Sequence, residues 1–328
     1  METRSRFESS FPSNFSRLSV PCLATIDLGT NTVRLLVVEV TDRSHWRVLQ
    51  QDQAITRLGE GLTRNGVLSE IAIARTVFQV TAFCQRAEQL GANEILLVAT
   101  SAVREAQNQA TILQEIHAAT GRTARVISGE EEARLTFLGA RIGLAVPTGH
   151  WALIDIGGGS TEFILAEQDT IRTAISLQLG VVPLTEALVR ADPVDWTEYA
   201  TLSAHIETRL AREISQDFFA GPLSGMIGTA GTVTALAALD QGLEAYLPER
   251  VQGYQLRRHR VEKLLAFLGS LRLDARAHLP CLEPGRADLI IPGIAICVAT
   301  MKLFNLEYLT VSDYGLREGV LVERLRAL

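Results

Sequence analysis

The sequence contains one pattern twice, first as Ala24-Thr-Ile-Asp-Leu-Gly-Thr-Asn-Thr32 and again as Leu153-Ile-Asp-Ile-Gly-Gly-Gly-Ser-Thr161. Each copy has an apolar run, an aspartate where that run ends, and a turn of glycine and hydroxyl residues that leads into a second strand. Two strands joined by such a turn predict a β-hairpin. Because the hairpin recurs far along the chain, the sequence predicts two homologous lobes.

Helices and strands alternate along the rest of the chain. Apolar residues at helical spacing predict a helix over 69–90, and a compact apolar run predicts a buried strand over 94–99. Short strands are expected over 125–127 and 309–311. Further helices are expected over 104–120, 130–139, 184–189, 196–219, 233–239, 261–271, 287–304 and 316–328. This alternation predicts an α/β fold.

Length and charge narrow the class of protein. A chain of 328 residues is long for one hydrophobic core, so two domains are expected. The net charge of -6 argues against general nucleic-acid binding, which needs a basic surface. A polyanionic ligand would need a local positive groove.

The sequence predicts a cytoplasmic protein with no membrane span. Its four cysteines show neither a C-x-x-C nor a zinc-like spacing, and no secretory signal precedes them. The longest apolar run, residues 289–301, contains Pro292 and Gly293 and is too short to cross a bilayer. Residues 1–21 are polar and serine-rich, which predicts a disordered tail.

The two hairpin turns are candidate phosphate-binding sites. Glycine lets the backbone approach a ligand, and successive N–H groups in such turns bind anions. Neutral donors accompany the glycines in both turns: Thr30, Asn31, Thr32, Ser160 and Thr161. The alternative is that each turn merely closes a tight hairpin.

Asp27 and Asp155 stand at the strand ends beside these turns. A phosphate would repel them unless a cation lay between, and Mg²⁺ favours one or two carboxylates together with phosphate oxygens and water. Glu162, one strand further on, is a candidate direct or indirect ligand. The alternative is that the aspartates cap local backbone amides.

Two further segments carry candidate phosphate-binding residues. Gly225-Met-Ile-Gly-Thr-Ala-Gly-Thr-Val233 predicts a third turn, which leads into a helix whose N-terminus attracts anions. Ser101 and Arg104 follow a buried strand, where ligand-facing loops occur. Arg104 is expected to clamp a phosphate, unless it forms an ordinary helix pair with Asn108.

Gly129-Glu-Glu-Glu-Ala-Arg134 places three carboxylates at a helix start. One of them is a candidate general base for water attack on phosphorus, but residue chemistry does not select which. Complementing the helix dipole is the alternative role. The basic cluster Arg257-Arg-His-Arg260 is expected to form a solvated face.

Seven motifs, in family order, resemble the exopolyphosphatase/guanosine pentaphosphate phosphatase family. They are Asp27–Arg34 (DLGTNTVR), ATSAVREAQN, Ile127–Leu135 (ISGEEEARL), Ile154–Phe163 (IDIGGGSTEF), GTAGTVTALAA, Ile290–Ile296 (IIPGIAI) and Ser312–Leu321 (SDYGLREGVL). The resemblance covers nearly everything after residue 21. It implies two actin-like, ribonuclease H-like lobes with an interdomain cleft, over 22–130 and 131–313. It also implies that the helix at 314–328 joins lobe I.

The resemblance also implies residue roles. The catalytic base falls on Glu132, and Asp155, Glu162 and Asp27 take metal-associated places for Mg²⁺ or another divalent cation. Phosphate-binding places fall on Arg104, Ser101 and the glycine turns with their flanking residues. Arg104 is also expected to be catalytic, with Glu132, by steadying the transferring phosphoryl group. These turn residues are Gly29, Thr30, Asn31, Thr32, Arg34, Gly157, Gly158, Gly159, Ser160, Thr161, Gly231 and Thr232.

The implied activity is metal-assisted release of terminal orthophosphate from inorganic polyphosphate. Guanosine pentaphosphate hydrolysis, non-catalytic polyphosphate or alarmone sensing, and a kinase of the same superfamily are the alternatives. Ala230 stands where many members have serine, and the chain ends directly after SDYGLREGVL, which favours shorter substrates. A homodimer is a further expectation, although no sequence feature indicates one.

Overall fold

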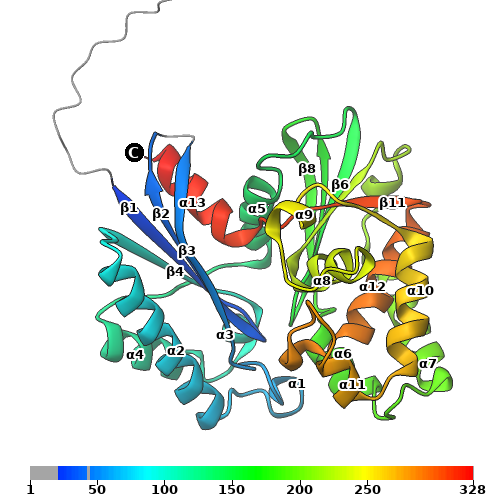
Figure 1. The fold of residues 1–328 in the computed structure, drawn as a ribbon, viewed down its shortest axis with the longest axis horizontal. Helices are drawn as coiled ribbons and strands as arrows, with labels where there is room; N and C mark the ends of the chain where they lie inside the picture. The colour runs from blue at the N-terminus through cyan, green and yellow to red at the C-terminus, as the bar shows by residue number, and fades with distance from the viewer. Residues whose placement is uncertain (1–20, 43–44, 328) are drawn as a thin grey trace, which may run out of the picture.

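The computed structural model describes residues 21–42 and 45–327 (Figure 1). The predicted disordered tail therefore lies outside the described residues, except for Pro21. Within them, a five-stranded sheet has the order β3-β2-β1-β4-β5, and a six-stranded sheet has the order β10-β11-β9-β6-β7-β8. Helices pack on both sheets, which confirms the predicted α/β class (Figure 1).

The five-stranded sheet forms the first lobe. Its strands are β1 (Cys22–Leu28), β2 (Thr32–Val40), β3 (Trp46–Ile55), β4 (Glu94–Ala99) and β5 (Arg125–Val126). The helices that follow these strands are α1 (Leu62–Asn65), α2 (Glu70–Gln89), α3 (Ser101–Glu105) and α4 (Gln109–Thr120). Strand β1 pairs antiparallel with β2 and parallel with β4, so the predicted first hairpin is present.

The six-stranded sheet forms the second lobe. Its strands are β6 (His150–Ile156), β7 (Thr161–Glu167), β8 (Thr170–Leu177), β9 (Met226–Thr229), β10 (Gln255–Arg257) and β11 (Tyr308–Val311). Strand β6 pairs antiparallel with β7 and parallel with β9. Strand β1 likewise has one antiparallel and one parallel neighbour. The repeat in the sequence therefore corresponds to a repeat in strand pairing.

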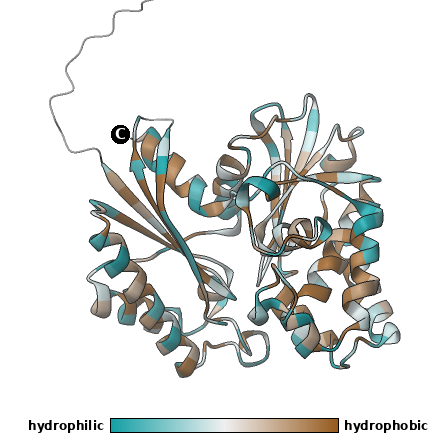
Figure 2. Cartoon of the chain, viewed as in Figure 1, coloured by the Kyte–Doolittle hydropathy of each residue, from teal (hydrophilic) through white to brown (hydrophobic). Residues whose placement is uncertain are grey.

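The remaining helices follow the first lobe in sequence. They are α5 (Gly129–Ala140), α6 (Val181–Leu188), α7 (Trp196–Glu213), η1 (Gln216–Phe219), α8 (Ala230–Asp240), α9 (Pro248–Val251), α10 (Arg258–Ser270), α11 (Leu273–Ala277), η2 (Pro284–Arg286), α12 (Ile290–Leu303) and α13 (Leu316–Arg326). Helix α12 is hydrophobic on all sides and buried along most of its length, as a core helix should be (Figure 2). None of the helices in the described part of the chain is both long and apolar enough for a membrane crossing.

Helices α5 and α13 cross between the two sheets (Figure 1). A Cβ on Gly319 would lie 1.8 Å from the carbonyl oxygen of Leu135, so only glycine permits this backbone approach. Leu321 and Leu325 of α13 also pack against strands β1 and β2. The last helix therefore contacts the first sheet and α5 together.

The structure corrects the predicted helix over 104–120. This segment contains two helices, α3 and α4, separated near Asn108. The Asn108 side chain accepts a hydrogen bond from the Leu68 N–H (2.9 Å) and donates one to the Leu68 carbonyl (2.9 Å). These bonds to a distant loop hold the break, and the local sequence does not reveal them.

Candidate active site

A cavity of about 570 Å³ lies between the lobes and receives residues from both. Most of the predicted site residues line it. They are Asp27, Gly29, Thr30, Asn31, Thr32, Arg34, Ser101, Glu132, Asp155, Gly157, Gly158, Gly159, Ser160, Gly231 and Thr232. Arg104, Thr161 and Glu162 lie behind this lining and reach it through the contacts described below.

The two hairpin turns have matching geometry. The Gly29 N–H donates to the Thr32 carbonyl at 3.1 Å, and the Gly157 N–H donates to the Ser160 carbonyl at 3.0 Å. A Cβ on either glycine would lie 2.9 Å from that same carbonyl oxygen. Side chains larger than hydrogen are therefore crowded out of both turns.

The turns also face each other across the cavity. A Cβ on Gly159 would lie 2.6 Å from Thr30 Oγ1 and 2.4 Å from Ser101 Oγ. Both hydroxyls belong to the first lobe, whereas Gly159 belongs to the second. A ligand seated here contacts backbone and hydroxyl donors from both lobes, which is the arrangement that anion-binding turns provide.

Carboxylates gather beneath the turns. Asp155 and Glu162 are cross-strand partners on β6 and β7. Thr136 Oγ1 donates to Asp155 Oδ2 at 3.4 Å, and Ser176 Oγ donates to Glu162 Oε1 at 2.7 Å. Asp27 Oδ1 is buried and has no hydrogen-bond partner within the described residues, so that oxygen caps no backbone amide there.

Burial shifts the titration of these groups. It raises the pKa of Asp27 to about 6, against the opposing pull of Arg34. It raises the pKa of Asp155 to about 6, again opposed by Arg34, while the charge of Asp27 adds to the rise. It raises the pKa of Glu162 to about 7, with the charge of Asp155 adding to it. Buried carboxylates of this kind need a compensating cation to ionise together.

Glu132 lies in the first turn of α5, which begins where Ser128 Oγ accepts the Glu131 N–H. Among the three adjacent glutamates, Glu132 is buried and lines the cavity, Glu130 is exposed, and Glu131 pairs with Arg125. Burial raises the pKa of Glu132 well above its usual value, and the charge of Glu162 adds to that rise.

Arg104 is aimed at Glu132. Its Nη1 donates to Glu132 Oε2 at 2.9 Å and to the Ile127 carbonyl at 2.9 Å. Its charge lowers the pKa of Glu132 and so opposes the effect of burial. The alternative pair with Asn108 is not what holds it, because the Asn108 side chain is engaged by Leu68. Arg104 thus links the end of strand β4 to the carboxylates of the second lobe.

The third predicted turn meets an arginine that the sequence reasoning missed. Gly231 and Thr232 line the cavity at the start of α8, and a Cβ on Gly231 would lie 2.0 Å from Arg286 Nη1. Burial lowers the pKa of Arg286, and the positive charge of Arg34 adds to that effect, which brings the pKa to about 10. Two arginines from opposite lobes therefore share one cavity, which favours an anion between them. The Pro284-Gly285 turn before Arg286 was the available sequence signal.

The residues present fit a divalent cation held jointly with substrate. In the part of the chain that the structure describes, no three His, Cys, Asp or Glu side chains are arranged to hold a metal by themselves. Mg²⁺ usually needs only one or two protein carboxylates beside phosphate oxygens and water. The unpartnered Asp27 oxygen and the raised pKa values of Asp155 and Glu162 are what a missing positive charge would produce. The basic cluster at 257–260 does not line the cavity.

A two-lobed, actin-like α/β fold with paired glycine turns and buried carboxylates in the cleft defines an enzyme class that acts on phosphate groups. The model of the Ppx/GppA phosphatase family matches residues 36–328, and the chain belongs to that family. It is therefore a hydrolase, and the predicted family resemblance is confirmed.

Named relatives and solved structures agree with this assignment. Exopolyphosphatase 2 of Mycobacterium tuberculosis is 33% identical, over 91% of this chain and 97% of the relative. Exopolyphosphatase 1 of the same organism is 29% identical, over 92% and 88%. The structure is similar to the Ppx/GppA family member of Aquifex aeolicus (30% identity, TM-score 0.78, 94% and 98% of the two chains). It is also similar to an exopolyphosphatase of Cytophaga hutchinsonii (25% identity, TM-score 0.87, 94% and 98%).

Proposed function

We propose that this protein is an exopolyphosphatase that releases terminal orthophosphate from inorganic polyphosphate. One observation carries the proposal: the carboxylate of Glu132, hydrogen-bonded to Arg104, lines a cavity that two facing glycine turns also line. Phosphate chemistry needs a phosphate held in place and a base that acts on water, and this cavity holds groups suited to both. The names of the Mycobacterium tuberculosis relatives support polyphosphate as the substrate.

The residues divide the work as follows. Backbone N–H groups of both turns bind the terminal phosphates, and Arg34 and Arg286 neutralise part of their charge. Glu132 orients a water and takes its proton, because its carboxylate lines the cavity and its pKa, raised by burial, makes it a stronger base than an exposed glutamate. Arg104 holds the Glu132 carboxylate in place and stabilises the transferring phosphoryl group. Mg²⁺, when bound, would be held by one or two of the carboxylates Asp155, Glu162 and Asp27 together with phosphate oxygens, and would neutralise charge on the scissile bond.

Guanosine pentaphosphate is the second candidate substrate. Tyr246, Pro248 and Leu282 line the cavity in the second lobe and give it an aromatic and apolar surface. Bases stack on such side chains, so this surface suits a nucleoside attached to the phosphates. Inorganic polyphosphate has no group that would use it.

The test compares phosphate release from short polyphosphate, long polyphosphate and guanosine pentaphosphate, each with and without Mg²⁺. Glu132→Gln should lower the rate roughly 10²–10⁴-fold, because it removes the base but keeps the shape. Glu130→Gln is the matched control, since Glu130 lies two residues away on the same helix turn and is exposed. We expect it to leave the rate unchanged.

The outcomes separate the candidates. Mg²⁺-dependent release from polyphosphate that Glu132→Gln abolishes supports the proposal. Faster release from guanosine pentaphosphate would favour the nucleotide. Near-full activity of a folded Glu132→Gln variant would show that another group is the base, and tight binding without release would favour the sensor alternative.

We also infer a cytoplasmic location. Cys22, Cys84, Cys281 and Cys297 are all free thiols, which suits a reducing compartment. The homodimer stays a prediction, which light scattering of the purified chain would check.

A further inference from the structure

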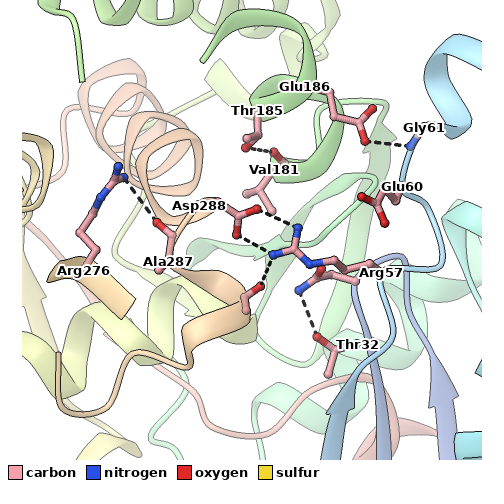
Figure 3. Close-up of polar contacts among 12 residues, drawn as sticks. Thr32, Arg57, Glu60, Gly61, Val181, Thr185, Glu186, Arg276, Ala287 and Asp288 are labelled. Carbon is pink, nitrogen blue, oxygen red and sulfur yellow. Dashed lines mark hydrogen bonds and ion pairs between the residues drawn. The ribbon is translucent and has the colours of Figure 1, made fainter. Parts of the chain in front are cut away.

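Polar contacts from strand β3 and the β3–α1 segment join the first lobe to the second. In Figure 1, α1 and α6 lie on the side of the molecule away from α5 and α13. Figure 3 shows the two most buried of these contacts, from the segment between β3 and α1 to the second lobe. Arg57 binds Asp288, and the Gly61 N–H donates to Glu186 Oε1 at 2.8 Å. We call these contacts, with the Gln53 contacts described below, the interlobe bridge.

The Arg57–Asp288 contact is a two-pronged ion pair. Arg57 Nη1 donates to Asp288 Oδ2 at 2.8 Å, and Arg57 Nη2 donates to Asp288 Oδ1 at 3.0 Å. Arg57 Nη2 also lies 3.3 Å from the Gly285 carbonyl. Such forked pairs fix orientation as well as distance. The Arg57 side chain is 34% exposed and the Asp288 side chain is 24% exposed, so the pair is partly shielded from solvent.

The backbone of Arg57 is tied to the first phosphate turn. Its N–H donates to the Asn31 carbonyl at 2.9 Å, and the Gly59 N–H donates to the Thr30 carbonyl at 2.8 Å. Arg57 also has a φ of +46°, in the left-handed region that few residues other than glycine adopt. Strained backbone of this kind persists where surrounding contacts enforce it, and it is concentrated at functional sites.

On the other lobe, Asp288 follows the η2 turn that carries Arg286. The side chain of Arg286 is itself held from both sides of the cleft. Its Nη2 donates to Gln53 Oε1 of strand β3 at 2.8 Å, and its Nε pairs with Glu283 Oε2 at 2.9 Å. Gln53 Nε2 in turn donates to Glu283 Oε1 at 2.6 Å.

These contacts connect the first phosphate turn to the Arg286 turn through Arg57 and Asp288, neither of which lines the cavity. We propose that Arg57 is a positioning residue for the reaction proposed above, on which this inference rests. By binding Asp288 across the cleft, Arg57 keeps the Thr30–Thr32 turn and the Arg286 guanidinium close enough to contact the same phosphate group. Closing the lobes and completing the phosphate site are then a single event, as in other enzymes that close around their substrate.

The test measures KM and kcat for tripolyphosphate in Asp288→Asn, Arg57→Lys and Arg57→Ala. Asp288→Asn should raise KM on the order of tenfold, the size expected for weakening a charge-assisted bond. It should change kcat much less, because bound substrate still draws the lobes together. Lysine keeps the charge of Arg57 but not its fork, so Arg57→Lys should fall between wild type and Arg57→Ala.

Asp169→Asn is the matched control. Asp169 pairs with Arg141 at 2.8 Å, but both residues belong to the second lobe and lie outside the cavity. Its KM should equal that of wild type. Small-angle X-ray scattering without substrate should show a larger radius of gyration for Asp288→Asn than for Asp169→Asn. A purely structural role would lower thermal stability without moving KM or the lobe separation.

Gln53→Ala provides a second, exposed variant that leaves the Arg57 pair intact. It should raise KM in the same direction, by less than Asp288→Asn. If Asp288→Asn and Gln53→Ala both match the control in KM and in scattering, the inference is wrong. The proposed function still stands in that case, provided that the wild-type protein releases phosphate. If wild type releases no phosphate, the proposed function fails, and the scattering comparison still decides whether the bridge holds the lobes together.

Discussion

The two glycine turns have matching backbone hydrogen bonds, but the residues that face their aspartates carry opposite charges. In the first lobe, Asp27 lies across the β-ladder from Arg34. In the second lobe, the equivalent Asp155 lies across from Glu162. The first turn therefore lies beside a carboxylate that faces a positively charged side chain. The second turn lies beside two carboxylates that face each other.

This difference indicates a division of labour between repeated units. The first turn can meet a phosphate with the positive charge of Arg34 already present. In the proposed function, Mg²⁺ would supply the positive charge at the second turn. The repeat gives both lobes a similar glycine turn for binding phosphate. The residue that faces each aspartate, Arg34 or Glu162, determines whether that lobe would also need a metal cation.

Among the tests of this comparison between the turns, the largest effect should come from removing one aspartate at a time. Asp155→Asn should raise the Mg²⁺ concentration needed for half-maximal phosphate release by about a hundredfold, the upper range for losing a supporting group at a metal site. Asp27→Asn should raise it less, because Arg34 and Arg317 remain beside it. Mg²⁺ titrations of the two variants measure the difference, and equal shifts would mean that the two turns share the metal.

A smaller effect should follow from filling the space between the turns. Gly159→Ala places a methyl group against Ser101 and Thr30 of the other lobe, so it should raise KM about tenfold, in line with overpacking costs of about 1–3 kcal/mol. Gly29→Ala crowds only its own turn. We therefore expect scattering to show separated lobes for Gly159→Ala alone. A change of the same size in Gly29→Ala would contradict the facing arrangement.

The smallest effect concerns stability against pH. The raised pKa values of Asp27, Asp155 and Glu162 mean that the folded protein holds protons that the unfolded chain has already lost. Without Mg²⁺, the free energy of unfolding should therefore fall as pH rises from about 4 to about 7. Adding Mg²⁺ should raise Tm more at pH 8 than at pH 5.

Asp155→Asn serves as the control in these melts. It removes one of the three shifted carboxylates, so both the pH slope and the Mg²⁺ response should shrink. Thermal unfolding at several pH values, with EDTA or Mg²⁺, checks this. A wild-type protein whose stability without Mg²⁺ rises over that range would show that other groups dominate.

The predicted elements that proved right are those with strong local signals. The hairpins at Asp27 and Asp155 have buried strands on both sides of a glycine turn, so the chain near them determines their structure. Strand β8 was not predicted, because only its last residue is buried and its apolar and polar residues mix. The helix over 104–120 failed for a different reason, since its break depends on Asn108 binding a loop distant in sequence.

The same distinction applies to the site. Residues on the turns were predictable because glycine, hydroxyl and carboxylate side chains occur together in sequence. The choice of Glu132 among its neighbours needed the family resemblance, because burial separates the three glutamates and their order does not. Arg286 was missed because its place depends on how η2 meets Gly231 in space.

The packing of α13 also affects how the protein is made. Leu321 and Leu325 cover hydrophobic residues of strands β1 and β2, which leave the ribosome almost three hundred residues earlier. At about 5–20 residues per second, that gap lasts roughly 15–60 seconds. During this time the face of the first sheet that α13 covers has no partner, so the nascent chain exposes hydrophobic surface to chaperones until α13 has been synthesised.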